Sequence, residues 1–330
     1  MAKFDSKNLK HIAVLTSGGD APGMNAAIRA VVRVGIFNDL KVTAIYRGYH
    51  GLIDQDYEEL QPGSVANTIQ RGGTIIKTDR CKEFYTKSGR ARAAKHFRSA
   101  GFDGLVTIGG DGTFTGAHFL WREHGIPVVG VPGTIDNDVY GTDRTIGFDT
   151  AVNTAMDAID KVRDTAASHD RLFIVEVMGR NSGHIALEVG LAAGAEEVFI
   201  PEYKVSIKHV CKVIERGIKR GKKSSILICA EGQTPGRSYG IAKEIKKASG
   251  YEAKVCILGH IQRGGSPTAY DRNLASRMGA AAVSFLLKGF TDIMVGEVNQ
   301  NIRAVPLKDA FSKKKVVRKD WLNLEKTLSI

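Results

Sequence analysis

The most constraining feature of the sequence is a pair of turns rich in glycine and aspartate, each of which follows a short apolar run. The first turn covers residues 109–113 and follows the apolar residues 105–108, and the second covers 132–138 and follows 128–131. The segment between them has the composition of a helix. This strand–helix–strand pattern predicts a parallel sheet, in which ligands bind at the carboxyl ends of the strands. The two turns therefore predict a site for a metal-bound polyphosphate beside a group that is deprotonated.

Apolar runs alternate with helical patterns along most of the chain, which predicts an α/β fold of two domains, each a mostly parallel sheet covered by helices on both faces. Residues 48–86 are polar and are expected to be irregular, and residues beyond 288 are expected to form only a short basic tail. The further strands are expected at 12–16, 42–46, 172–177, 197–200, 225–230 and 254–258. The helices are expected at 25–37, 89–100, 114–124, 150–166, 184–193, 207–220 and 271–288, with one more between 239 and 254.

Composition excludes several classes of protein. No apolar run reaches the roughly 18–20 residues that cross a membrane, and the first ten residues contain no apolar signal core. The four cysteines lack metal-type spacing, which disfavours a zinc site or a disulfide framework and predicts a cytoplasmic protein. The net charge of +12 fits either a solvated surface or an enzyme with anionic substrates. The basic clusters contain no aromatic residues for base stacking, so we expect no nucleic-acid partner.

A third glycine-rich turn, residues 17–23, lies between an apolar strand and a helix. Backbone N–H groups at such a helix N-terminus can bind a phosphate, although Gly18 and Gly19 would also suit a purely structural tight turn. The chain contains neither the G-x-x-x-x-G-K-[ST] sequence nor a well-placed G-x-G-x-x-G sequence. A P-loop nucleotidase and a dinucleotide-dependent dehydrogenase are therefore both disfavoured.

The residues of these turns each have a structural and a functional interpretation. Asp111 could be a helix N-cap, or it could bind magnesium beside phosphates, because Mg²⁺ favours one or two carboxylates with substrate oxygens. The segment 134–138 could be only an Asx-type turn, or it could hold Asp136 as a base beside an acceptor hydroxyl. His260 could be structural, or together with Arg263 it could contact a sugar hydroxyl or phosphate.

Five motifs in this order resemble the bacterial ATP-dependent 6-phosphofructokinases, over residues from about 11 to 324. The motifs are residues 17–25, 109–113, 132–138, 178–180 and 259–267. The resemblance implies a larger ATP-binding domain of residues 1–147 and 262–311. It also implies a smaller domain for the sugar phosphate, made of residues 148–261 and 312–330. The implied reaction transfers a phosphoryl group from Mg-ATP to the 1-hydroxyl of fructose 6-phosphate, a step of glycolysis.

The resemblance implies specific roles for residues of this chain. Asp136 would take the proton from the 1-hydroxyl, and Thr134 and Arg180 would stabilise the transferring group. The cofactor that the resemblance implies is Mg²⁺, which would lie beside Asp111. The ATP site would comprise Gly18, Arg80, Cys81, Gly110, Asp111, Gly112 and Thr113. The sugar-phosphate site would comprise Thr134, Asp136, Met178, Gly179, Arg180, Glu231, His260 and Arg263, with Arg171 and Lys254 supplied by a neighbouring subunit.

The same resemblance predicts a homo-oligomer, expected to be a tetramer. Lys254 stands where arginine is usual, and a lysine cannot form the two-pronged contact of a guanidinium with phosphate. Pyrophosphate-dependent relatives usually carry aspartate where Gly112 stands and lysine where Gly133 stands. The two glycines leave a nucleotide pocket open, so ATP is favoured as the donor over pyrophosphate.

A second anion site, for ADP as an activator or phosphoenolpyruvate as an inhibitor, is implied less completely. Its expected residues are Arg29, Arg33, Arg163, Gly194, Glu196, Arg220 and Lys222. However, Pro62, Gly63 and Ser224 stand where relatives usually have, respectively, a phosphate-binding arginine, an aromatic residue that packs on adenine, and a basic residue. The sequence therefore predicts that regulation through this site is weak.

Overall fold

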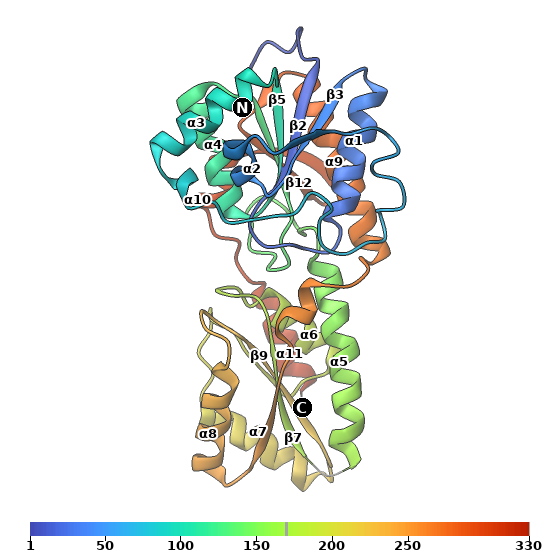
Figure 1. Ribbon diagram of the computed structural model, residues 1–330. Helices are drawn as coiled ribbons and strands as arrows, with labels where there is room; N and C mark the ends of the chain where they lie inside the picture. The colour runs from blue at the N-terminus through green and yellow to red at the C-terminus, as the bar shows by residue number, and fades with distance from the viewer. Residues whose placement is uncertain (169–170, 330) are drawn as a thin grey trace. The chain divides into compact units, whose positions relative to one another are not determined.

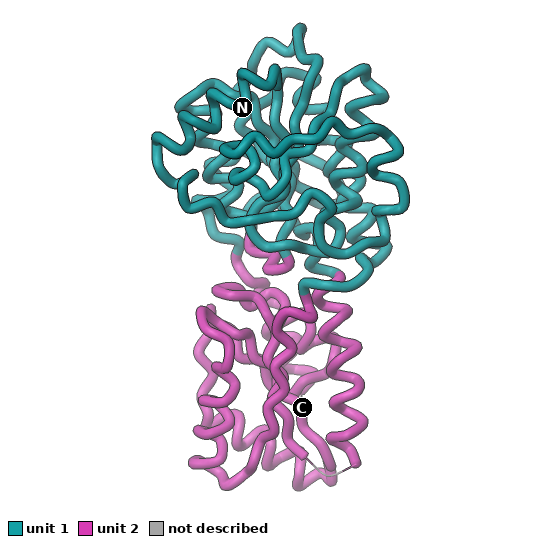
Figure 2. The backbone as a smooth tube through the Cα atoms, in the orientation of Figure 1, with its two compact units in different colours: residues 1–134, 139–149, 263–315 teal, residues 135–138, 150–262, 316–330 magenta. Residues whose placement is uncertain are grey.

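The alternation of strands and helices expected from the sequence is present in the computed structural model, which describes residues 1–168 and 171–329. The chain forms two units (Figure 2). Unit 1 comprises residues 1–134, 139–149 and 263–315, and unit 2 comprises residues 135–138, 150–262 and 316–330. The assignment of residues 1–147 and 262–311 to a larger domain and of 148–261 and 312–330 to a smaller one stays a prediction, and residues 169–170 and 330 of the smaller domain lie outside the described residues.

Unit 1 contains a seven-stranded sheet with the strand order β13-β12-β6-β5-β2-β3-β4. The five strands from β12 to β3 run parallel, and β13 and β4 pair antiparallel at the two edges. The strands are β2 (His11–Thr16), β3 (Lys41–Ile45), β4 (Tyr57–Glu59), β5 (Gly104–Gly109), β6 (Val128–Pro132), β12 (Ile293–Val298) and β13 (Asn301–Pro306). The central strands β2, β5 and β6 are apolar and almost wholly buried, as expected for a sheet covered on both faces. A short separate ribbon pairs β1 (Ala2–Lys3) with β11 (Phe290–Thr291).

Helices cover both faces of this sheet (Figure 1). On one face α1 (Met24–Phe37) packs along α9 (Ala269–Leu287). The other face carries α2 (Tyr49–Asp54), η1 (Glu83–Tyr85), α3 (Lys87–Ser99), α4 (Asp111–His124) and α10 (Leu307–Ser312). The hydrophobic core beneath this second group includes the buried side chains of Phe97, Phe114 and Leu105.

Unit 2 contains a four-stranded sheet, order β10-β7-β9-β8, in which every pair is parallel. The strands are β7 (Leu172–Val177), β8 (Glu197–Phe199), β9 (Ser225–Ala230) and β10 (Ala253–Ile257). Helices α7 (Ile207–Lys219) and α8 (Arg237–Ser249) lie on one side of the sheet (Figure 1). Helices α5 (Phe148–Ser168), α6 (His184–Ala193) and α11 (Lys319–Leu328) lie on the other, and the short η2 (Gly259–Arg263) follows β10.

The fold class is therefore as predicted, but three local expectations are wrong. The region 48–86 is not irregular throughout, because it contains α2, β4 and η1. The segment after 288 is not a basic tail but contains the strands β11 to β13 and the helices α10 and α11. Helix α4 begins at Asp111, with Gly110 as its N-cap, so Asp111 is not the cap.

Among the residues that the structure describes, no helix is both long and apolar enough to cross a membrane.

Candidate active site

Three of the predicted turns lie together at one edge of the sheet in unit 1. Strands β2, β5 and β6 are neighbours, with Thr16 paired with Ile108 and Gly109 paired with Pro132. Because the strands are parallel and their ends are in register, residues 17–19, 110–113 and 133–134 all leave the sheet at its carboxyl edge. The structure thus brings together the three glycine-rich segments that the sequence places far apart.

Hydrogen bonds fix these turns against one another. The Thr113 hydroxyl donates to the Ser17 carbonyl oxygen at 2.9 Å, and the Gly133 amide donates to the Gly109 carbonyl oxygen at 3.0 Å. Gly109 has no room for a side chain, because a Cβ there would lie 2.3 Å from Thr113 Oγ1 and 2.4 Å from the Ser17 oxygen. The close approach of the turns therefore depends on glycine at this position.

The N-terminus of α4 faces this edge and carries the residues predicted to hold phosphates and magnesium. Asp111 and Gly112 are exposed, whereas Thr113 is buried. A Cβ on Gly112 would meet no atom within 4 Å, so the space beside the helix N-terminus is open. The backbone N–H groups of the first helical turn point toward this space, and with the helix dipole they favour an anion there, while Asp111 offers carboxylate oxygens to a hard cation. The described residues contain no cluster of three or more His, Cys, Asp or Glu side chains able to hold a metal. A Mg²⁺ ion at Asp111 would therefore need phosphate oxygens to complete its shell.

Residues 78–81 line the same turn from another side. The Thr78 hydroxyl donates to the Gly18 carbonyl oxygen at 2.9 Å, and the Gly18 amide donates to the Asp79 carbonyl oxygen at 3.3 Å. Asp79 bonds His50 at 2.8 Å and the amide of Arg80 at 2.6 Å, and these hydrogen bonds lower the pKa of its carboxyl group. The segment therefore holds Arg80 at the surface beside Gly18, while the next residue, Cys81, is buried.

Arg263, predicted as a sugar-phosphate contact, lies in unit 1. Its guanidinium group donates to the Asp20 carbonyl oxygen at 3.1 Å. A Cβ on Gly19 would lie only 2.6 Å from Arg263 Nη1, so the guanidinium packs directly against the turn that follows β2. This contact places a fixed positive charge beside the candidate phosphate site.

In unit 2 the predicted sugar-phosphate residues also follow neighbouring strand ends. Val177 pairs with Ala230, and Glu176 pairs with Ile257, so the ends of β7, β9 and β10 are aligned. Met178, Glu231 and the segment 258–260 consequently leave the sheet at the same carboxyl edge. The Glu231 amide donates to the Val177 carbonyl oxygen at 2.9 Å, which joins the loops after β9 and β7.

The turn after β7 adopts a conformation that its sequence makes possible. Gly179 has φ +140°, and a Cβ there would lie 2.4 Å from the Ser182 carbonyl oxygen. Arg180 has φ +53°, and its amide donates to Glu231 Oε1 at 3.2 Å. The Ser182 hydroxyl donates to the Asp136 carbonyl oxygen at 3.0 Å. Asp136, 8% exposed, is thereby joined to the turn that carries Arg180.

Sequence reasoning missed Glu176, a buried carboxylate near the end of the otherwise apolar strand β7. Its oxygens accept hydrogen bonds from the amides of Gly236 (2.7 Å) and Ser238 (2.9 Å) and from the Ser238 hydroxyl (2.6 Å). Its backbone carbonyl accepts from the Leu258 amide at 3.0 Å. Glu176 thus caps the N-terminus of α8 and anchors the loop that begins at Glu231. The signal that could have found it is a single charge inside an apolar strand.

Arg171 and Lys254 lie at the other end of the same strands. Arg171 directly precedes β7, and Lys254 is the second residue of β10; both are exposed. At about 3.3 Å per residue, Arg171 lies roughly 20 Å from the carboxyl end of β7, and Lys254 lies roughly 10 Å from the carboxyl end of β10. Within unit 2, therefore, neither side chain reaches the edge that carries Met178 and Glu231.

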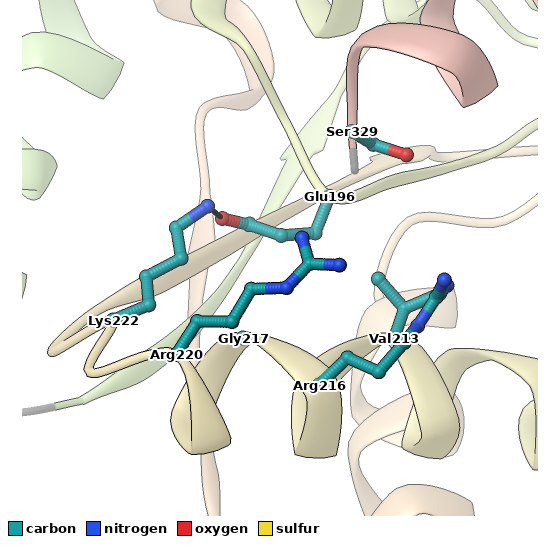
Figure 3. A pocket seen from close by; sticks show the side chains of 7 residues that line it. All are labelled: Glu196, Val213, Arg216, Gly217, Arg220, Lys222 and Ser329. Carbon is teal, nitrogen blue, oxygen red and sulfur yellow. Dashed lines mark ion pairs between the residues drawn. The ribbon is translucent and has the colours of Figure 1, made fainter.

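The predicted effector residues divide between the two units. Arg29 and Arg33 lie on α1 in unit 1, whereas Arg163, Gly194, Glu196, Arg220 and Lys222 lie in unit 2. Unit 2 contains a cavity of about 70 Å³. Figure 3 shows the side chains that line it. Its lining includes Glu196, Arg220 and Lys222, together with two polar residues that the sequence did not suggest, Arg216 and Ser329. Lys222 forms an ion pair with Glu196 in this cavity, and Arg163 donates a hydrogen bond to the Ala193 carbonyl oxygen.

Comparisons with known proteins agree with this arrangement. Residues 11–286 match the family model described as Phosphofructokinase. The chain is 57% identical over 322 residues to ATP-dependent 6-phosphofructokinase 1 of Thermus thermophilus, an alignment that covers 98% of this chain and 100% of that protein. The structure of phosphofructokinase from Saccharomyces cerevisiae is similar with a TM-score of 0.87 and 38% identity, over 92% of this chain and 45% of that one. A pyrophosphate-dependent phosphofructokinase from Marinobacter aquaeolei shares the fold, with a TM-score of 0.83 and 23% identity over 96% of this chain and 91% of that one.

Proposed function

The chain belongs to the phosphofructokinase family, and we propose that it transfers the γ-phosphoryl group of Mg-ATP to the 1-hydroxyl of fructose 6-phosphate. The products are fructose 1,6-bisphosphate and ADP, and the reaction is a step of glycolysis, with a cytoplasmic location. The observation that carries this proposal is the 57% identity over 98% of the chain to a protein named for that ATP-dependent activity.

The residues of unit 1 bind and orient the donor. The backbone of residues 110–113 and Gly18 holds the nucleotide phosphates, and Arg80 supplies a positive charge beside them. Asp111 would hold Mg²⁺, which neutralises phosphate charge when bound. Cys81 contributes to the wall of the nucleotide site. These roles require no movement of a proton, so unit 1 acts mainly by positioning and by electrostatics.

The residues of unit 2 bind the acceptor and move its proton. Met178, Gly179, Glu231 and His260 hold the sugar phosphate, together with Arg263 of unit 1. Asp136 accepts the proton of the 1-hydroxyl as that oxygen attacks phosphorus. Arg180, together with Thr134 of unit 1, stabilises the charge on the transferring phosphoryl group. The hydrogen bond from Ser182 to the Asp136 backbone supports this proposal, because it joins the base to the turn that carries Arg180.

A coupled assay with two donors tests the donor and the acceptor together. We expect rapid turnover with ATP and fructose 6-phosphate, and less than about 1% of that kcat/KM when pyrophosphate replaces ATP. The physical reason is the open space at Gly112, which a nucleotide needs and pyrophosphate does not. Equal use of both donors, or a preference for another sugar phosphate in the same assay, would contradict the proposal.

The active enzyme is a homo-oligomer, expected to be a tetramer, because Arg171 and Lys254 complete the sugar-phosphate site of a neighbouring subunit. Their position at the amino edge of the sheet supports this assignment, since they lie far from the carboxyl edge of their own unit. Lys254 provides a point charge where relatives have a guanidinium, so the affinity for the sugar phosphate is lower than with arginine.

Mixing two inactive variants tests the shared site. The R171A subunit keeps the base Asp136 in its own site, and the D136S subunit keeps the Arg171 that it supplies to a neighbour's site. A site between an R171A subunit and a D136S neighbour can therefore contain both residues. Dissociating a 1:1 mixture and reassembling it should restore about a quarter of wild-type activity if subunits associate at random. Activity no higher than that of the separate variants, or full activity from a monomer at assay concentration by light scattering, would contradict the shared site.

An anion such as ADP or phosphoenolpyruvate binds at a second site made of Arg29, Arg33, Arg163, Gly194, Glu196, Arg220 and Lys222. Its effect on fructose 6-phosphate binding is weak, because Pro62, Gly63 and Ser224 remove contacts that relatives have. One lost charge-assisted contact costs about 1.5–3 kcal/mol, enough to weaken an effector by tenfold or more.

Initial rates at low fructose 6-phosphate test this weak regulation. With ADP or phosphoenolpyruvate added to millimolar concentration, we expect the half-saturating sugar concentration to change by less than about tenfold. A larger change would mean a coupling free energy above about 1.4 kcal/mol and would contradict the interpretation of Pro62 and Gly63. Sodium sulfate at the same ionic strength, added in place of the effector, serves as the control for salt effects.

A further inference from the structure

The cavity in Figure 3 is strongly basic but contains one carboxylate. Arg216, Arg220 and Lys222 supply three positive charges, and Glu196 is the only acidic side chain among the lining residues that the structure describes. Lys222 Nζ is paired with a Glu196 oxygen, and the other Glu196 oxygen accepts from the Ile226 amide. An anion that entered this cavity would therefore compete with Glu196 for Lys222.

The C-terminal helix α11 connects this cavity to a buried carboxyl group. Ser329, which follows α11, lines the cavity, and Glu325 lies one turn earlier in the helix. Glu325 is only 2% exposed, and neither of its carboxylate oxygens has a hydrogen-bond partner within residues 1–168 and 171–329. A carboxylate in this environment lacks the hydrogen bonds that would stabilise its charge.

Two further buried carboxylates lie next to Glu325. Glu197 and Glu196 are 2% and 4% exposed, and both interact electrostatically with Glu325. The cations that interact with this group are Lys222, which pairs with Glu196, and Lys326 on α11. His209 of α7 is a further titratable residue, with Nε2 at 3.5 Å from Glu197 Oε2. Helix α6, which packs against α11, contributes His184 and Glu188 as its titratable residues.

Burial and charge repulsion together keep part of this group protonated. Burial, with the charge of Glu197 as the second cause, raises the pKa of Glu325 to about 7. Burial also raises the pKa of Glu197. Glu325 and Glu197 are buried carboxyl groups that interact with each other, so their protonation responds to a change in the nearby charge.

We propose that binding of a phosphorylated anion in the cavity lined by Arg216, Arg220 and Lys222 is linked to uptake of one proton by the cluster of Glu325 and Glu197, which interacts with Glu196. The proposal rests on the effector site described under the proposed function and adds its control by pH. The bound anion takes Lys222 from Glu196 and adds negative charge of its own. Both changes favour protonation of the cluster, with the proton coming from solvent.

The sign of the pH effect follows from this linkage. Below about pH 7, Glu325 is already neutral, and the anion binds without taking up a proton. Above that pH, Glu325 is ionised in the free protein and must gain a proton when the anion binds. Affinity therefore falls as pH rises, by at most about tenfold per pH unit for one proton.

Titration calorimetry with phosphoenolpyruvate tests the linkage on the full-length protein. Between pH 6.5 and 8.5 we expect the affinity of the wild type to fall about tenfold more than that of E325Q. Comparison of the two proteins removes the contribution of the ligand's own ionisation. K222Q identifies the site, because it should lose binding at every pH. E325L, which is also neutral, should behave like E325Q.

The variants also have folding controls. E325Q lacks a buried charge, so its melting temperature at pH 8 should be equal to or above that of the wild type. Its kinase activity without phosphoenolpyruvate should equal that of the wild type. Failure of phosphoenolpyruvate to bind to the wild type at pH 6.5, or unchanged binding by K222Q, would contradict the effector site and this inference with it. Binding in the cavity with the same pH dependence in wild type and E325Q would contradict only the proton linkage.

Discussion

Replacement of Asp136 by serine is expected to lower kcat by about 10²–10⁴-fold, which is the usual contribution of a positioned general base. Serine removes the carboxylate but leaves the backbone, whose carbonyl accepts the hydrogen bond from Ser182. The dissociation constant for ATP should change little, because the proposed nucleotide residues belong to unit 1 and Asp136 to unit 2. Steady-state kinetics and equilibrium nucleotide binding measure the two effects separately.

Two further variants sharpen this test. D136N keeps the size of the side chain but removes its basicity, so it should lose kcat to a similar extent. D157S changes a surface aspartate on α5 that pairs with Lys161, both side chains being 72% exposed, and should leave kcat unchanged. If D136S kept more than about a tenth of the wild-type kcat, Asp136 would not be the base.

Replacement of Gly112 by aspartate is expected to lower kcat/KM for ATP by about 100-fold or more. A Cβ at Gly112 would meet no atom within 4 Å, so the change is electrostatic and not a clash. A carboxylate about 4 Å from one phosphate charge costs between roughly 1 and 4 kcal/mol, depending on the local dielectric, and ATP carries several such charges. The new carboxylate would also occupy the helix N-terminus that we propose for the phosphates.

The matched control for this prediction is G240D. Gly240 lies on α8 and is exposed, and a Cβ there would likewise meet no atom within 4 Å. G240D therefore adds the same charge as G112D, but outside the proposed nucleotide site. G112D should not unfold at a lower temperature than the wild type, because acidic residues near the start of α4 favour the helix. A Michaelis constant for ATP that is equal in G112D and wild type would contradict the assignment of α4 to the phosphates.

The central strands and their turns could be predicted from the sequence because local signals coincide there. Around Gly109 an apolar run, a glycine turn and a helical pattern follow one another, and the parallel register then aligns the strand ends. The Asp, Gly and Thr residues after those strands indicated a site for a metal-bound polyphosphate beside a group that is deprotonated. The assignment of individual roles stays a prediction, because it depends on substrates that the sequence does not position.

Two of the missed elements end in turns that lack the usual glycine. The β12–β13 hairpin turns through Asn299 and Gln300, which have φ +49° and +64°, whereas two-residue hairpins of this kind usually contain glycine. Helix α2 likewise ends at Gln55, with φ +62°, instead of at a glycine. All three residues are exposed and adopt the left-handed conformation without being glycine, so the local sequence did not reveal these turns.

The cavity in unit 2 was only partly predictable for a different reason. Glu196 and Lys222 lie within 30 residues of each other, but Ser329 and Glu325 come from a segment more than 100 residues later. Their proximity depends on how α11 packs against α6. No periodicity in the sequence indicates which buried carboxyl groups such packing brings together.

The position of Arg171 and Lys254 at the amino edge of the sheet has a consequence for how the enzyme responds to dilution. If those two cations serve a neighbour's site, a separated subunit keeps its whole nucleotide site but only part of its acceptor site. Protein concentration would then control the affinity for the sugar and leave the affinity for the nucleotide unchanged. Assembly would then raise the affinity for the sugar phosphate alone. A cell that makes little of this chain would lose flux through the phosphorylation step first when sugar phosphate is scarce.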